Sequence, residues 1–318
     1  TFKEGGTNFT NSLLVGTSGT GTLSSADGNT GVGTAVLAAL TTGDNNVAVG
    51  KSAMAANTTG HSNIAIGANS LDANTTTSEN VSIGHQSMGA NTAGSQTTAV
   101  GVFALQKNTT GYQNTAIGYE ALHDNTEAHD NVALGAYALH KNTTATANTG
   151  LGLQTLFTNT VGHSNTAVGF KTMLDNTTGD YNTAIGKDAL ANNTTADLNT
   201  AVGYQSLNAN TTGSNLTAMG VESLNANTTA SNNTAFGAEA LKKTTTGDTN
   251  TAMGVSSGAC NTTGEHLTAI GFEALKAHTT AADNTAVGYR SMLLTTTGAC
   301  NVAVGFQSAQ ANTTGSCN

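Results

Sequence analysis

The segment Asn114–Asp130, N-T-A-I-G-Y-E-A-L-H-D-N-T-E-A-H-D, is one copy of a block that repeats along most of the 318-residue chain. Glycine recurs at the fifth position of every copy, from Gly33 to Gly305, always 17 residues apart and without insertion or deletion. Seventeen such copies cover residues 29–317. A fixed period of this kind predicts a repeat architecture, in which each block stacks on the next.

A degenerate copy at 12–28, with Val15-Gly16 in register, comes before the regular ones. We therefore divide the chain into an N-terminal segment, 1–28, with one degenerate coil, and a regular repeat domain, 29–318. Seventeen residues are too few for two helices and a connection, but they suit one turn of a β-solenoid. The predicted fold is all-β: a parallel β-solenoid (β-roll or β-helix) of about 17 coils, with equivalent residues stacked at about 4.8 Å.

The columns of the repeat, numbered from Asn114 as position 1, indicate two strands in each coil. Position 2 is Thr, Val or Ile, which favour strands, and position 4 is always apolar and is expected to be buried. We expect N-T-A-V-G to be one strand, and the segment through Ala-Leu at positions 8 and 9 to be the other. The chain contains no proline, which would remove a ladder donor from a strand.

Positions 3 and 5 carry only Ala, Ser or Gly. Such a face permits close approach by another backbone, so we expect the chain to associate with copies of itself, as a trimer. A monomer with a compact interior packed on Ala and Gly is the alternative. The repeat glycines that we single out are Gly50, Gly67, Gly84, Gly101, Gly118, Gly135, Gly169, Gly186, Gly203, Gly220 and Gly237.

Asparagines at positions 1 and 12 are expected at the corners of the coil, where Asn tolerates unusual dihedral angles and can bond to the Asn above and below. The predicted corner asparagines at position 12 are Asn57, Asn74, Asn108, Asn142, Asn176 and Asn210. Several of these begin N-x-T sequons, as does Asn312, so N-glycosylation is an alternative reading that we favour less.

Composition excludes several classes of protein. Lys+Arg number 10 and Asp+Glu 19, a net charge of −9, which argues against nucleic-acid binding. No apolar run is long enough for a membrane helix, so no insertion is expected. Charged residues make up only 9%, and three cysteines are too few for a disulfide scaffold.

Candidate chemistry is sparse. Glu222 and Glu239 share position 7 in adjacent coils, near the spacing of a retaining glycosidase pair, but a solvated column is the preferred interpretation. Position 10 brings His123 next to His140, and position 17 brings Cys300 next to Cys317, where a disulfide is an open alternative. We expect no enzyme activity, metal site or cofactor.

Opposite charges are expected to stack from coil to coil and to fix the register. The pairs are Lys171 with Asp188, Glu273 with Arg290, and Asp124 with Lys107 and Lys141. Aromatic residues gather at position 6, as a candidate stripe for chain–chain contact or, less favoured, for stacking on sugar rings. The stripe comprises Tyr119, Phe170, Tyr204, Phe272, Tyr289 and Phe306.

The unit N-T-A-V-G-Y-x-A-L-x-x-N-T-T-G resembles repeats of phage and algal-virus tail-fibre-like proteins, over about nine tenths of the chain. It also resembles the head repeats of trimeric autotransporter adhesins, which have a shorter coil. The resemblance implies a fibrous protein that is extracellular or carried on a cell surface or virion.

We therefore expect a structural fibre protein, a rigid shaft or adhesin for surface attachment. Its partners would be copies of itself, with cell-surface glycans as further candidates. The second hypothesis is a self-assembling filament whose subunits stack head to tail. The third is an ice-binding solenoid, suggested by the regular Thr columns.

Overall fold

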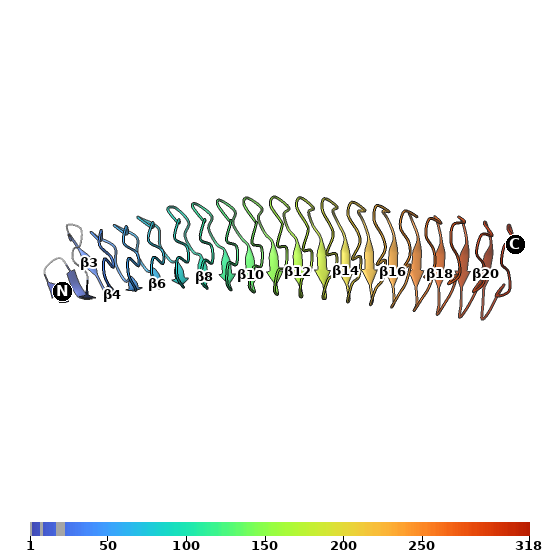
Figure 1. The fold of residues 1–318 in the computed structure, drawn as a ribbon, viewed down its shortest axis with the longest axis horizontal. Helices are drawn as coiled ribbons and strands as arrows, with labels where there is room; N and C mark the ends of the chain where they lie inside the picture. The colour runs from blue at the N-terminus through green and yellow to red at the C-terminus, as the bar shows by residue number, and fades with distance from the viewer. Residues whose placement is uncertain (1, 7–8, 17–22) are drawn as a thin grey trace. The chain divides into compact units, whose positions relative to one another are not determined.

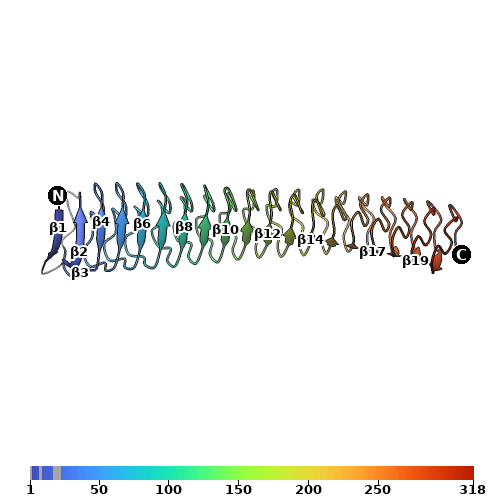
Figure 2. The ribbon, with the colours of Figure 1, turned by 90° about the horizontal axis from the view of Figure 1, so that it is seen from below.

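The protein was analysed as a computed structural model, which describes residues 2–6, 9–16 and 23–318, without the side chains of 2–6. The chain divides into two compact units, Thr1–Val161 and Gly162–Asn318. Within each unit, successive coils follow one another in chain order (Figures 1 and 2). No helix occurs in the described ranges.

The first unit contains β1 to β11. Their bounds are β1 Phe2–Gly6, β2 Phe9–Val15, β3 Ala26–Asp27, β4 Thr30–Val32, β5 Val47–Val49, β6 Ile64–Ile66, β7 Val81–Ile83, β8 Thr98–Val100, β9 Thr115–Ile117, β10 Val132–Leu134 and β11 Thr149–Leu151. The second unit contains β12 to β20. Their bounds are β12 Thr166–Val168, β13 Thr183–Ile185, β14 Thr200–Val202, β15 Thr217–Met219, β16 Thr234–Phe236, β17 Thr251–Met253, β18 Thr268–Ile270, β19 Thr285–Val287 and β20 Val302–Val304.

Pairing between coils is parallel and in the predicted register. Thr115 pairs with Val132 in the first unit, and Thr183 pairs with Thr200 in the second, each one repeat apart. The predicted parallel β-solenoid with its 17-residue repeat is confirmed. At the N-terminal end, β2 pairs in parallel with β4, with Val15 opposite Val32, while β1 pairs with β2 antiparallel.

The predicted second strand is wrong, because each regular coil has one three-residue strand and is otherwise built of turns. Ala121 and Leu122, adjacent in sequence, are both fully buried, whereas a strand would send them to opposite faces. Positive φ angles at Glu120 (53°) and Leu122 (51°) bend the backbone so that the side chains of Ala121 and Leu122 both point inward. Bonds to both neighbouring coils persist: Glu120 N donates to Val102 O, and Leu122 N to Ala138 O.

The expected burial of position 4 is also wrong. In β9, Ala116 at position 3 is fully buried, whereas Ile117 at position 4 is 40% exposed. The interior is narrow: a Cβ on Gly150, at position 3, would lie 2.9 Å from Thr155 Oγ1 and 3.5 Å from Cγ of Leu139, a position-9 leucine. Position 3 is therefore small because the leucines of the opposite side fill the interior, as in the compact-interior alternative, and no other chain has access to it.

Candidate functional site

The most distinctive surface is the outward side of the three-residue strands, formed by positions 2 and 4. We call it the outer sheet face of each unit. Position 2 is always Thr, Val or Ile and position 4 is always apolar, so no charged residue lies on this face in any regular coil. In the second unit, Ile185 is 42% exposed, Met219 38% and Met253 43%. The face is a continuous uncharged surface in contact with solvent.

Such a face is unusual for a parallel sheet. Parallel sheets are normally covered on both sides, and solvated sheet faces normally carry polar residues. Exposed contiguous apolar surfaces mark sites of interaction. The outer sheet face is therefore the strongest candidate for binding another molecule.

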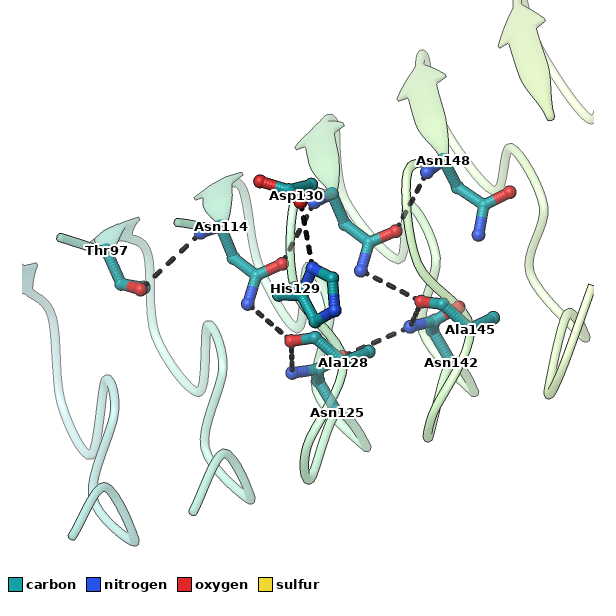
Figure 3. Close-up of polar contacts among 10 residues, drawn as sticks. Thr97, Asn114, Asn125, Ala128, His129, Asp130, Asn142, Ala145 and Asn148 are labelled. Carbon is teal, nitrogen blue, oxygen red and sulfur yellow. Dashed lines mark hydrogen bonds and ion pairs between the residues drawn. The ribbon is translucent and has the colours of Figure 1, made fainter. Parts of the chain in front are cut away.

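Two ladders of buried asparagine hold the coil that supports this face (Figure 3). At position 1, Asn114 Nδ2 donates to Ala128 O (2.8 Å), and Asn114 Oδ1 accepts from the backbone N of Asn131 (3.0 Å). At position 12, Asn125 Nδ2 donates to the same Ala128 carbonyl (3.1 Å) and to Asn108 Oδ1 (2.7 Å). The two ladders thus share one carbonyl acceptor in each coil.

The predicted corner asparagines all lie inside the coil rather than at its surface. The fully buried residues are Asn57, Asn74, Asn108, Asn142, Asn176 and Asn210. The expectation of unusual dihedral angles at the asparagines of positions 1 and 12 is wrong, since the non-glycine residues with positive φ in the coil Asn114–Asp130 are Glu120, Leu122 and Asp130. An N-linked glycan also has no access to a buried Nδ2 in the folded chain; Asn312, near the end of the chain, is only half-buried.

Each repeat glycine lets adjacent coils approach closely. Gly186 has φ 129°, and a Cβ added to it would lie 2.6 Å from Gly203 O, one coil later. A side chain would therefore meet both backbone strain and a steric overlap. The same positive-φ conformation occurs at Gly50, Gly67, Gly84, Gly101, Gly118, Gly135, Gly169, Gly203, Gly220 and Gly237.

The aromatic stripe is not one uniform column. Phe272, Tyr289 and Phe306 are stacked nearly parallel, with centroids 5.4 and 5.3 Å apart, and the Arg290 guanidinium lies over the first two rings. Phe170 and Tyr204 form a second group, joined by the ammonium group of Lys187, which lies over both rings.

Tyr119 belongs to an aromatic cluster that the columns of the repeat do not predict. It meets Phe103 and Tyr137 edge to face, and Tyr137 in turn lies near His140 and Phe157. These partners occupy positions 7 and 10, which the turns bring next to position 6. A hydrogen bond to Glu120 raises the pKa of Tyr119 to about 12.

The carboxylate pair Glu222 and Glu239 is bridged by one cation. Lys242 Nζ lies 2.6 Å from Glu222 Oε2 and 2.9 Å from Glu239 Oε1. The hydrogen bond from Lys242 lowers the pKa of Glu239. A glycosidase needs a carboxyl group with a raised pKa as its general acid, and Glu239, whose pKa is lowered, does not suit that role.

Two of the four predicted charge pairs form. The pairs of Lys171 with Asp188 and of Lys141 with Asp124 do not, and the Lys141 ammonium group lies over the Phe157 ring instead. Arg290 Nε lies 2.7 Å from Glu273 Oε2, and Lys107 Nζ lies 2.8 Å from Asp124 Oδ1.

The predicted pairing of Lys171 with Asp188 is replaced by other contacts. Asp188 lies 3.8 Å from Lys187, and the Lys171 ammonium group lies over the Phe170 ring.

The histidines and cysteines form no converging set of ligands. His123 and His140 stack with parallel rings 5.1 Å apart. Cys260, Cys300 and Cys317 are free thiols. Within 2–6, 9–16 and 23–318, no three metal-ligating side chains are grouped around a common point.

Gly89 is among the residues that line a shallow hollow in the first unit. The volume of the hollow is about 430 Å³, and Asp72, Gln86 and Gln106 also line it. Gln106 already donates to Gln86 Oε1 (2.8 Å) and contacts His123 Nε2 (2.7 Å). The side-chain amides of Gln86 and Gln106 at this hollow are thus already hydrogen-bonded within the protein.

Across the described part of the chain, no helix is long and apolar enough to cross a membrane. No protein-family model matches the chain, and no curated protein matches its sequence.

Proposed function

We propose that the chain is a structural, non-enzymatic shaft, and that copies of it pack against one another through their outer sheet faces. The single observation that carries this proposal is the uncharged outer sheet face, with Ile185 and Met253 more than one third exposed in the isolated chain. Burying this face removes apolar side chains from water, at about 25 cal/mol per Å².

A second copy is the partner favoured by the periodicity. Both faces would carry side chains at the same coil spacing, so a contact made in one coil can be made again in every coil. A closed group around an axis suits one apolar face on each copy, and we propose a homotrimer. An extracellular place on a cell surface or virion, with a role in attachment, is the setting that we propose for such a shaft.

Ice is a less suitable occupant of the same face. The consecutive position-4 residues Val202, Met219 and Phe236 differ in length, so the face is uneven. Valine and isoleucine also interrupt the Thr column at position 2, at Val47, Ile64 and Val81. An uneven apolar surface favours interdigitation with side chains rather than contact with a flat crystal plane.

Charged substitutions on two sides of one coil test the proposal. Ile185→Lys places a cation on the outer sheet face, and Thr195→Lys places one on an exposed corner of the same coil. We expect Ile185→Lys to lower the assembly mass measured by light scattering, with an unchanged circular dichroism spectrum, while Thr195→Lys leaves the mass unchanged. Equal masses for both variants and the original chain would contradict the proposal.

Electron microscopy distinguishes lateral packing from the head-to-tail stacking of the second hypothesis. Lateral packing through the outer sheet face gives particles of one fixed length. In Ile185→Lys we expect these particles to become thinner, as single chains, without becoming shorter. Threads of indefinite length that persist in Ile185→Lys would instead support head-to-tail stacking.

A further inference from the structure

The position-12 ladder of the second unit contains one ionisable side chain, His278, where most coils have asparagine. Its side chain is fully buried. The edge of its ring faces backbone directly: a Cβ on Gly264 would lie 2.6 Å from His278 Cε1. The ring therefore packs closely against the backbone of Gly264, away from solvent.

The hydrogen bonds of the ring require the neutral form. His278 Nδ1 lies 3.2 Å from Asn261 Oδ1, and Asn284 Nδ2 lies 3.2 Å from His278 Nε2. Because Asn284 donates to Nε2, that nitrogen accepts, and Nδ1 carries the proton. Histidine has this pattern only when it is uncharged.

Other bonds fix the orientation of both flanking amides. Asn261 Oδ1 accepts from Gly264 N (3.0 Å), so this oxygen must face the ladder as an acceptor. Asn284 Nδ2 donates to Gly298 O (2.8 Å), and its Oδ1 accepts from Asn301 N (3.0 Å). Rotating the Asn284 amide to accept from a protonated ring would break both of these bonds.

Among the residues that the structure describes, no acidic side chain forms an ion pair with this ring. Glu273 is paired with Lys276 and Arg290 on the outside of the coil, and Asp283 is exposed and lies against His266. Burial alone lowers the pKa of His278, to about 4. The folded coil therefore opposes protonation, whereas the opened coil takes up a proton at the ordinary histidine pKa near 6.5.

We propose that His278 makes the coil Leu267–Asp283 an acid-labile point of the solenoid, where protonation of the ring breaks the buried ladder and opens this coil and the next. The folded-state pKa is depressed, so stability is complete above about pH 6.5 and declines as the pH falls towards 4. Coils with asparagine at position 12 lack this response.

Hydrogen exchange at single-coil resolution tests the proposal, with His278→Asn as the matched variant. Exchange would be corrected for the intrinsic effect of pH and compared between residues 261–301 and the internal control 166–240. In the original chain, we expect the opening equilibrium of 261–301 to rise by about 100-fold between pH 7 and pH 4, and that of 166–240 to change little. In His278→Asn, we expect the two segments to respond alike.

An equal acid response of 261–301 in the original chain and in His278→Asn would overturn the proposal, as would the absence of a response in the original chain. Because a ladder variant can alter folding, NMR titration of the original chain supplies a second readout. His278 should stay neutral in the folded protein at pH 5.5, and a folded His278 that titrates near 6.5 without loss of protection would also overturn the proposal.

Discussion

Asn125 Nδ2 lies 2.7 Å from Asn108 Oδ1, one repeat earlier in the chain, and both side chains are fully buried. Asn125 thus donates to the coil before it, and its Oδ1 accepts from Asn142 Nδ2 in the coil after it (3.1 Å), as amide ladders do in stacked β-structures. Insertion of one residue would break this contact, which explains why the period never varies.

Replacing a ladder asparagine should destabilise the solenoid. Asn193 Nδ2 donates to Asn176 Oδ1 (2.7 Å) and Ala196 O (3.0 Å), and Asn193 Oδ1 accepts from Asn210 Nδ2 (3.1 Å). Asn193→Ala removes these bonds in a buried site, so we expect a loss of about 3 kcal/mol in unfolding free energy. Urea denaturation followed by circular dichroism measures it.

The neighbouring residue provides the control for that experiment. Asn192 is exposed, and its Nδ2 donates to Asn208 O at the surface (2.9 Å), so Asn192→Ala should change the unfolding free energy by less than about 1 kcal/mol. A similar loss in both variants would show that the buried ladder has no special role in stability.

Adding a methyl group to a repeat glycine should be more damaging than adding one elsewhere. Gly186→Ala meets φ 129° and an oxygen of Gly203 at 2.6 Å, so we expect a loss of at least about 3 kcal/mol. Gly89→Ala is the control, because its new Cβ would lie 3.4 Å from Asp72 Oδ1, in ordinary contact. If thermal denaturation shows the two variants to be equally stable, the close approach of coils at position 5 is wrong.

Adjacent residues of β14 test which side of the strand faces inward. Ala201 is fully buried, so Ala201→Leu should overpack the interior and lower the unfolding free energy by about 1–3 kcal/mol. Val202 lies on the outer sheet face, so Val202→Leu should change the unfolding free energy by less than about 0.5 kcal/mol in single chains. The opposite ranking, measured by urea denaturation of single chains kept apart by Ile185→Lys, would mean that position 4 faces inward.

The stacking of coils was predictable because a strict period places like residues in columns. Columns of glycine and asparagine are typical of coils that approach closely and bond through stacked amides. Which face of the strand points into the interior was not predictable. Alternation of Ala116 with Thr115 and Ile117 defines two faces, but it does not say which one is inside. That choice depends on Leu122, which enters the interior from the opposite side and leaves room only for alanine.

The turns between positions 6 and 11 were missed for a related reason. Glutamate and leucine rarely adopt positive φ, so Glu120 and Leu122 give no local signal for it. The conformation is imposed by the need to bury Ala121 and Leu122 together while the backbone bonds to both neighbouring coils. The aromatic cluster of Tyr119 and Tyr137 depends on those turns, so it could not be predicted without them.

The mass of the unmodified protein in solution, measured by multi-angle light scattering over a range of concentrations, tests the central claim most directly. One chain has a mass of 31.7 kDa. If the outer sheet face is covered by copies of the chain, the mass will be a constant small multiple of that value, and we expect three. A constant mass of 31.7 kDa at every concentration would contradict the account.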